Sequence, residues 1–269
     1  MAQKSSKQRA EEAVLDLNGK LRQLNKALAS KGATIAENAP LVATIKAVEA
    51  MRAGGSGASK SYPIYRIGQF EGYPDAELPP LRFAPSFTSG YSLFANCPIV
   101  SLDKPIEGIE RIVSLDSAFK GCGQMKRAIV GSAPLVQTIA NAFNSCTALE
   151  EVEITTSPAC TNMLAAFSGC GKLRTIRGTI DASACVTTYA TFLSCSSIEE
   201  VHIKGLKVDI DLSPCGNLSV ESVRYLVDNA QSVSGKRIDL SRKLLDANEE
   251  ALGDLGDTAS DKGWALNYK

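Results

Sequence analysis

Three groups of residues in this sequence are of types that could do chemistry: one histidine, eight cysteines and a closely spaced pair of aspartates. A Ser-His-Asp or Cys-His catalytic device would have to use His202, the only histidine. No nucleophile-elbow sequence accompanies it, so we interpret His202 as a solvent-facing strand residue. Asp209 and Asp211 have the spacing that places both side chains on one face of a strand. They could bind a cation or act as paired carboxylates, and the alternative is a pair of turn-forming or exposed charges.

The eight cysteines do not have the spacing of a zinc site. No two are separated by two residues, and the nearest pairs are ten apart. Five recur at one position of a repeat, and Cys160 and Cys185 share a second position. We expect reduced, buried thiols that pack as small hydrophobic groups, with disulfides between neighbouring coils as the alternative. The five recurring cysteines are Cys97, Cys122, Cys146, Cys170 and Cys195.

Composition and charge argue against several classes of protein. The chain has 269 residues, a formal net charge of zero and 44% hydrophobic residues, which is ordinary for a soluble globular protein. No run of about 18 apolar residues occurs, so we expect no membrane insertion. The N-terminal stretch 1–13 has no apolar core, so we expect no secretory signal. The first 60 residues hold ten Lys or Arg against five acids. No aromatic residue lies among these charges, so we expect a solvated helix surface and no nucleic acid.

One short phrase, an aromatic followed three residues later by cysteine, recurs every 24 or 25 residues. A strand-like run with alternating apolar and polar residues follows four of its five copies, as in LEEVEI. A fixed period in the twenties is typical of a solenoid, in which each repeat is stacked on the next. The aromatics are Phe94, Phe119, Phe143, Phe167 and Phe192.

The pattern F-x-x-C-x-x-L-x-x-[IV], with a triplet such as Thr161-Asn162-Met163 ahead of the phenylalanine, resembles the BspA-type leucine-rich repeat. That family occurs in bacterial surface proteins, mycoplasma lipoproteins and phage tail proteins. The resemblance covers about half of the chain. It implies a solenoid that serves as a recognition scaffold, with no ligand common to the family.

We therefore expect an α+β fold built on a leucine-rich-repeat solenoid of about five repeats, with a helical arm before it and an αβ cap after it. In the region before the repeats, aromatic residues between Tyr62 and Tyr73 predict one or two strands that cover the first edge of the solenoid. The predicted parts are an N-terminal arm (1–52), a Gly/Ser linker (53–60), N-terminal cap strands (61–86), the repeats (87–215) and a C-terminal cap (216–269).

The C-terminal cap is expected to contain two helices and two strands. Ser219 is the predicted N-cap of the first helix, and a second helix is predicted over about 246–262. Strands are predicted around Ile238 and from Trp264 to Tyr268. The ending DKGWAL resembles the tail of BspA-type repeat proteins.

The arm shows apolar residues at alternating steps of four and three, which is a heptad seam. A second helix is predicted to begin near Pro40, so the arm would be a helical hairpin or coiled coil that closes on itself or on copies of itself. Residues 21–51 also resemble a short helical module of phage tail and fibre proteins. The seam residues are Val14, Leu17, Leu21, Leu24 and Leu28.

The strands of the repeats predict a binding surface on their outward-facing positions. Its mixture of charges suits recognition of protein or glycan, and it equally suits a solvated sheet. The residues are Arg127, Ile129, Glu151, Glu153, Thr175, Arg177, Glu200 and His202.

Nothing in the sequence has the density of ionisable groups that an active site needs, so we expect no enzyme, no cofactor and no metal. We expect a virion protein of a bacteriophage, associated with the tail or tail fibre. The arm would bind itself or other virion proteins, and the solenoid would bind a host-surface protein or glycan, or a neighbouring virion protein. The first alternative is an adhesin on a bacterial cell surface, and the second is a purely structural virion protein without a host ligand.

Overall fold

A computed structural model describes residues 20–27 and 62–269 of the chain. The chain divides into two compact units, Met1–Lys60 and Ser61–Lys269. In the first unit, residues 20–27 form a helix in which Leu21 is half-buried and Leu24 is 45% exposed. The other seam residues, the second helix of the arm and the Gly/Ser linker lie outside the described residues.

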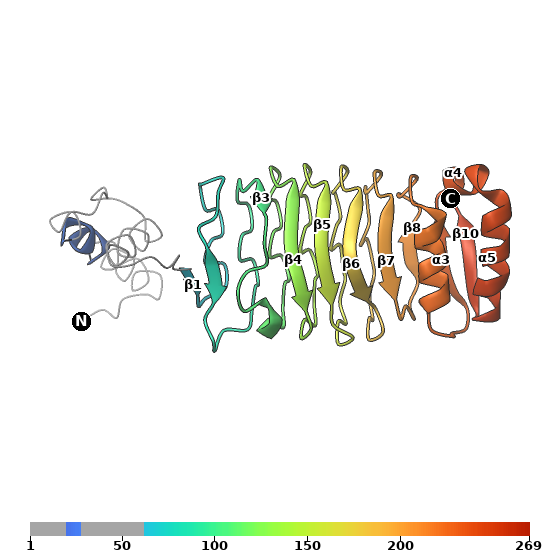
Figure 1. The fold of residues 1–269 in the computed structure, drawn as a ribbon, viewed down its shortest axis with the longest axis horizontal. Helices are drawn as coiled ribbons and strands as arrows, with labels where there is room; N and C mark the ends of the chain where they lie inside the picture. The colour runs from blue at the N-terminus through green and yellow to red at the C-terminus, as the bar shows by residue number, and fades with distance from the viewer. Residues whose placement is uncertain (1–19, 28–61) are drawn as a thin grey trace, which may run out of the picture. The chain divides into compact units, whose positions relative to one another are not determined.

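The second unit is a solenoid of parallel strands, which Figure 1 shows stacked one beside the next. Its main sheet has the order β3-β4-β5-β6-β7, and every neighbouring pair is parallel. A short 3-10 helix, Ile109–Arg111, precedes β4. The strands span Ser101–Leu102 (β3), Arg127–Ala133 (β4), Glu151–Thr156 (β5), Thr175–Asp181 (β6) and Glu200–Lys204 (β7).

The core of the solenoid is a column of phenylalanine rings, one from each coil. Neighbouring ring centroids lie 5.1 to 5.7 Å apart, close to parallel. Each ring sits in a tight turn whose flanking residues have positive φ, as Asn141 (52°) and Ser145 (63°) do around Phe143. Glycine and asparagine adopt this left-handed region at low cost, and the serines and alanines at the remaining positions lack the β-branched side chains that are least compatible with it. The turn therefore fixes where each ring points.

The predicted cysteine column lies directly behind the rings. Each thiol donates a hydrogen bond of 2.8 to 3.1 Å to the carbonyl oxygen of the phenylalanine one coil earlier, as Cys146 does to Phe119. All eight cysteines are free and buried. Burial raises the pKa of Cys122 to about 12, so the thiol stays protonated and keeps its hydrogen to donate.

A second ladder of hydrogen-bonded bridges runs along the solenoid, five residues before each phenylalanine of the repeats. Each side chain of this ladder accepts a hydrogen bond from the backbone N–H two residues on, for example Thr187 from Tyr189 at 3.3 Å. These local turns keep the ladder in phase with the phenylalanine column. Its members are Ser89, Ser114, Thr138, Asn162 and Thr187.

The region before the predicted repeats contains the two strands that were expected there and, between them, a further turn of the solenoid that was not predicted. Strands β1 (Tyr62–Ile64) and β2 (Leu81–Phe83) pair in parallel, and between them Phe70 stacks on Phe94 at 5.6 Å. Positive-φ glycines flank Phe70, and Tyr73 stands where later coils have cysteine. The phenylalanine column therefore has six rings rather than five.

After the repeats the chain changes from strand-only coils to strands paired with helices. Strand β8 (Ile210–Leu212) begins a second sheet of order β10-β9-β8, with β9 at Lys236–Leu240 and β10 at Trp264–Tyr268. Helix α3 (Val220–Asn229) starts at the predicted N-cap Ser219, whose hydroxyl accepts from the Ser222 N–H at 3.1 Å. Helix α3 covers β7, and α5 packs on both α3 and β10.

The helix predicted over about 246–262 is confirmed as α5 (Glu249–Asp261), and a short helix that was not predicted, α4 (Arg242–Ala247), precedes it. Asn248 between them has φ −145°, which breaks the helical path. Among the residues that the structure describes, no helix is long and apolar enough to cross a membrane.

Candidate binding cleft

The predicted strand-face residues lie on the outward side of β4 to β7, in register. Arg127 pairs with Glu151, which pairs with Thr175 on the next strand. The second row is interrupted, because the β6–β7 register shifts between Ile176 and Ile180. His202 stacks on Tyr225 of α3 instead, with ring centroids 4.5 Å apart.

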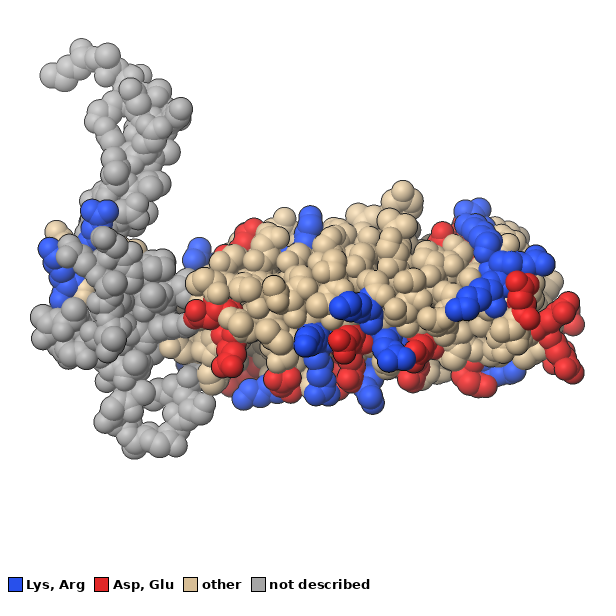
Figure 2. Space-filling model, turned by 90° about the horizontal axis from the view of Figure 1, so that it is seen from above, with Lys and Arg blue, Asp and Glu red and all other residues tan. Residues whose placement is uncertain are grey.

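Three charges of this strand face, Glu151, Arg127 and Arg177, lie close to one another. Glu151 lies 2.5 Å from the Arg177 Nε and 3.6 Å from the Arg127 Nε. Arg174 and Glu199 form a further pair at 2.7 Å. Figure 2 shows basic and acidic side chains intermixed along one long side of the solenoid. The strand face therefore carries both signs of charge, and within the described residues β4 to β7 expose no large apolar side chain beside them.

The aspartate pair does not converge on one point. An Asp209 carboxylate oxygen accepts the Arg237 backbone N–H at 3.0 Å. Asp211 accepts both the N–H and the hydroxyl of Ser213, at 2.9 and 2.6 Å. Within residues 20–27 and 62–269, no group of three or more His, Cys, Asp or Glu is placed to hold a metal ion.

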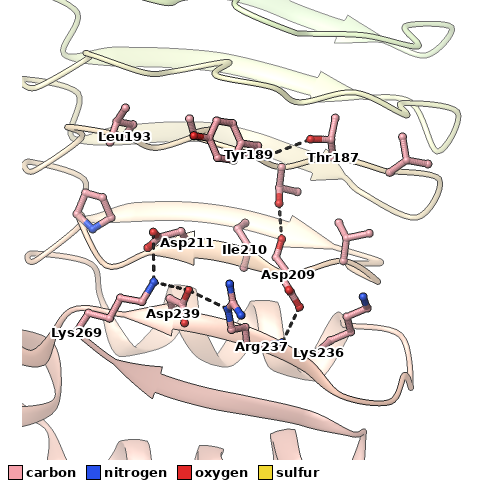
Figure 3. Close-up of a pocket in the computed structure, with 15 residues that line it drawn as sticks. Thr187, Tyr189, Leu193, Asp209, Ile210, Asp211, Lys236, Arg237, Asp239 and Lys269 are labelled. Atoms are coloured by element: carbon pink, nitrogen blue, oxygen red, sulfur yellow. Dashed lines mark hydrogen bonds and ion pairs between the residues drawn. The ribbon is translucent and has the colours of Figure 1, made fainter.

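A cleft of about 550 Å³ opens where the last repeat meets the second sheet (Figure 3). One wall comes from the coil that carries Phe192, and the other comes from β8, β9 and the end of β10. The Thr188 hydroxyl donates to the Asp209 carbonyl oxygen and so joins the two walls. The lining residues that matter here are Val186, Tyr189, Leu193, Lys236, Arg237 and Lys269.

The repeat-side wall is apolar although it faces solvent. Tyr189 is 76% exposed, Val186 69% and Leu193 54%. Burial alternates along this stretch: Thr187 is half-buried, Thr188 is buried and Tyr189 is exposed. Tyr189 therefore lies on the same outward side as the ladder residue Thr187, two residues before it. Large apolar groups exposed together in this way are typical of an interaction surface.

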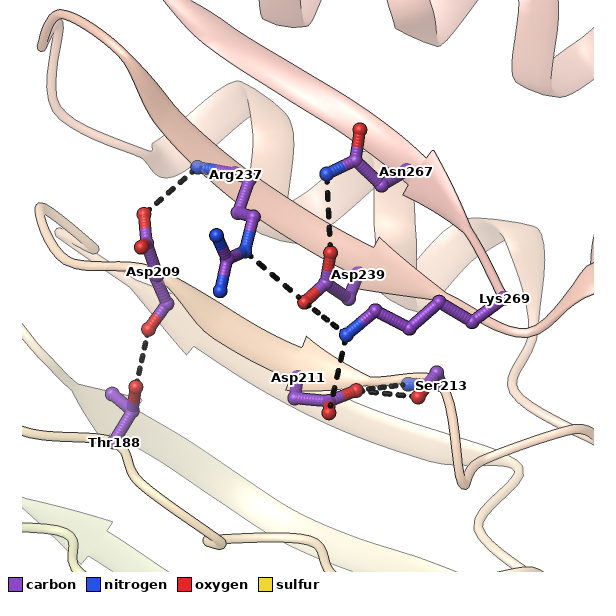
Figure 4. A network of polar contacts seen from close by, with 8 residues as sticks. All are labelled: Thr188, Asp209, Asp211, Ser213, Arg237, Asp239, Asn267 and Lys269. Carbon is purple, nitrogen blue, oxygen red and sulfur yellow. Dashed lines mark hydrogen bonds and ion pairs between the residues drawn. The ribbon is translucent and has the colours of Figure 1, made fainter.

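The opposite wall carries a charged network centred on Asp239, which is almost fully buried (Figure 4). Asp239 accepts from Lys269 at 2.7 Å, from Asn267 at 3.2 Å and from the Arg237 Nε at 3.3 Å. Burial alone would raise the pKa of Asp239, but the hydrogen bonds from Lys269 and Asn267 and the nearby cations outweigh it, so the pKa is lowered. The network therefore holds an ionised carboxylate and ties β9 to β10.

Two cationic groups at the cleft keep donors open. The Arg237 guanidinium uses only its Nε toward Asp239, and its two terminal NH₂ groups donate to none of the described residues. Lys236 forms no ion pair within the described part of the chain. Figure 3 shows both side chains beside the cleft. The cleft thus offers an exposed aromatic ring and unused cationic donors.

Of the sequence-based candidates, only Asp209 and Asp211 line this cleft; the strand-face residues do not. The repeats give no clear signal for Tyr189 and Val186. The position of Val186 holds Val113 in an earlier coil, and the position of Tyr189 holds Tyr91 in the first predicted repeat, so neither residue departs from the repeat. The remaining wall could not be found by comparing repeats, because it lies beyond the last of them.

Comparison with protein families matches the BspA type leucine rich repeat region, in 6 copies, to residues 77–157 and 115–234. No curated protein and no solved structure matches the chain significantly. Proteins of this repeat family are typically non-enzymatic, and their repeats indicate a role in protein binding. Because the match covers more than half of the chain, the chain belongs to the BspA-type leucine-rich repeat family.

Proposed function

We propose that the protein is a non-catalytic recognition component of a bacteriophage virion, associated with the tail or tail fibre. Its solenoid binds a protein on the host surface or a neighbouring virion protein. The observation that carries the binding role is the cleft beside Tyr189, where apolar groups are exposed next to unused cationic donors.

The cleft is a better centre for such a contact than the predicted strand face. Tyrosine and arginine are enriched among the residues that dominate protein–protein binding, and both are exposed here at Tyr189 and Arg237. The strand-face arginines Arg127 and Arg177 also contact Glu151 through Nε alone. Within the described residues, however, no large exposed apolar side chain lies on β4 to β7 beside them, whereas Tyr189, Val186 and Leu193 lie at the cleft.

The virion assignment rests on the N-terminal arm. Residues 21–51 resemble a helical module of phage tail and fibre proteins, and the arm (1–52) would fix the solenoid to the particle through copies of itself or through other virion proteins. The exposed Leu24 is an apolar group that such a contact would cover.

Immunogold electron microscopy tests this assignment. Antibody raised against the purified protein is applied to particles released by inducing the strain that encodes it, and separately to intact uninduced cells. Label at the tails of particles is the expected result. Label on the surface of uninduced cells would show the bacterial adhesin instead. Tail label from a protein that also fails to bind intact host cells would favour the purely structural virion protein.

A further inference from the structure

We infer that the cleft binds a short acidic peptide segment of a partner protein, one that places a carboxylate on Arg237 and an apolar side chain against Tyr189. The inference rests on the proposed role in protein binding and adds the chemistry of the partner.

The cationic groups of the cleft that lack a full set of partners indicate where a carboxylate of the peptide would bind. Lys269 lies 2.7 Å from Asp239 and 3.6 Å from Asp211, so its single positive charge is shared between these two acids. Arg237 contacts Asp239 through Nε alone. Its terminal NH₂ groups form a fork that matches the two oxygens of a carboxylate.

The exposed apolar side chains of the opposite wall indicate that the peptide also carries an apolar group. Tyr189, Val186 and Leu193 are each more than half exposed. Covering them with an aliphatic or aromatic side chain removes apolar area from water, which is the main driving force of association. A carboxylate and an apolar group on one short chain would satisfy both walls together.

The size of the cleft favours a segment over a folded surface. Its volume of about 550 Å³ lies within the range of pockets that take small ligands or a few side chains. The walls are preformed, since the Thr188 hydroxyl donates to the Asp209 carbonyl oxygen and Arg237 N–H donates to the Asp209 carboxylate. A peptide would therefore meet donors that are already in place.

The test is selection of a display library of random 12-residue peptides on the immobilised full-length protein, with counter-selection on the Arg237→Gln variant. Calorimetry then measures the Kd of an enriched peptide. Arg237→Gln is expected to weaken binding at least about tenfold, because a hydrogen bond to a charged group contributes more than the roughly 1.4 kcal/mol that equals a factor of ten. Tyr189→Ala is expected to weaken it by a similar factor, and added salt should weaken wild-type binding.

Two matched variants serve as controls. Arg177→Gln removes an equally exposed arginine from the strand face, and Tyr91→Ala removes a tyrosine from the equivalent position of the first predicted repeat. Both should bind the peptide as wild type does, and circular dichroism checks that every variant is folded.

Three results would overturn the inference: enriched peptides without Asp or Glu, equal binding by Arg237→Gln, or no peptide binding while polygalacturonic acid binds in an Arg237-dependent way. The last would identify an acidic glycan as the ligand. None of them changes the particle-labelling result, so failure of this inference is distinguishable from failure of the proposed function.

Discussion

At the scale of single residues, the phenylalanine column carries much of the stability of the solenoid. Phe143 is 1% exposed and lies between Phe119, at 5.1 Å, and Phe167, at 5.6 Å. Phe143→Ala should lower the free energy of unfolding by about 3–5 kcal/mol, because it leaves a cavity and removes two ring contacts. Urea denaturation measures this. Tyr189→Ala, at an exposed ring, should change it by no more than about 0.5 kcal/mol; equal losses in both variants would contradict a stacked core.

The thiols of the cysteine column should be inert in the folded protein. Burial raises the pKa of Cys97 and Cys195 to about 12, and only the thiolate reacts readily with alkylating reagents. Iodoacetamide at about pH 8 should therefore modify less than one cysteine per folded chain, and all eight after denaturation without reductant. Mass spectrometry counts the adducts. Fewer than eight adducts in the denatured, unreduced sample would show disulfides, the alternative that the sequence left open.

Columns of this kind could be predicted from the sequence because each position recurs at a fixed period. The first coil escaped prediction because Tyr73 stands in its cysteine position and its strand runs are short. The sequence still contains a sign of its turn, because Gly68 and Gly72 flank Phe70 and have the same positive φ as the residues that flank the later rings. The glycine pair was thus the signal to follow.

At the scale of elements, Asp239 joins strands that the sequence alone could not place together. It lies on β9 and accepts from Lys269 and Asn267 at the end of the chain beside it. Burial opposes ionisation of the Asp239 carboxyl, but its hydrogen bonds and the nearby cations favour ionisation more strongly. The pKa of Asp239 in the folded state therefore lies below the ordinary value of an aspartate. A carboxyl with a lowered folded pKa stabilises the fold above its unfolded pKa of about 4, and this contribution is lost as pH falls through the folded pKa.

Asp239→Asn should therefore lower the melting temperature at neutral pH, and the difference from wild type should shrink as pH falls below about 4. Differential scanning calorimetry at several pH values measures this. A difference that stays the same from neutral pH down to about pH 2.5 would show that the ionised form of Asp239 does not stabilise the sheet.

Helices and strands could be predicted where a local sequence pattern determines them. They were harder to predict where the backbone angle of a single residue determines where an element ends. Strands β4 to β7 follow from alternation of apolar and polar residues, and the start of α3 follows from Ser219. The break between α4 and α5 depends on the backbone angle of Asn248, which no periodicity reveals.

At the scale of the whole molecule, the cleft exists because a regular array ends and a different arrangement begins. The ladder that carries Tyr189 stops after Thr187, and the second sheet takes over with Arg237 on β9. Tyr189 belongs to a repeat coil and Arg237 to the second sheet, and the two have no common period, so sequence patterns could not bring them together. The strand face, by contrast, is periodic and could be predicted as a surface, although its charges turn out to be paired.

We propose that the arm assembles the protein into an oligomer, and its seam can be tested without the repeats being altered. Leu24 is 45% exposed in the single chain, so a heptad contact with another copy would bury it.

The full-length protein should be a defined oligomer in light scattering after size exclusion. The double variant Leu21→Lys, Leu24→Lys should be a monomer, because it places charges in an apolar seam. Gln23→Lys, which adds a charge at another exposed position of the same helix, should remain an oligomer. A monomeric wild type would show that the arm docks on a different protein, and the search for a partner would then start from the arm rather than from the cleft.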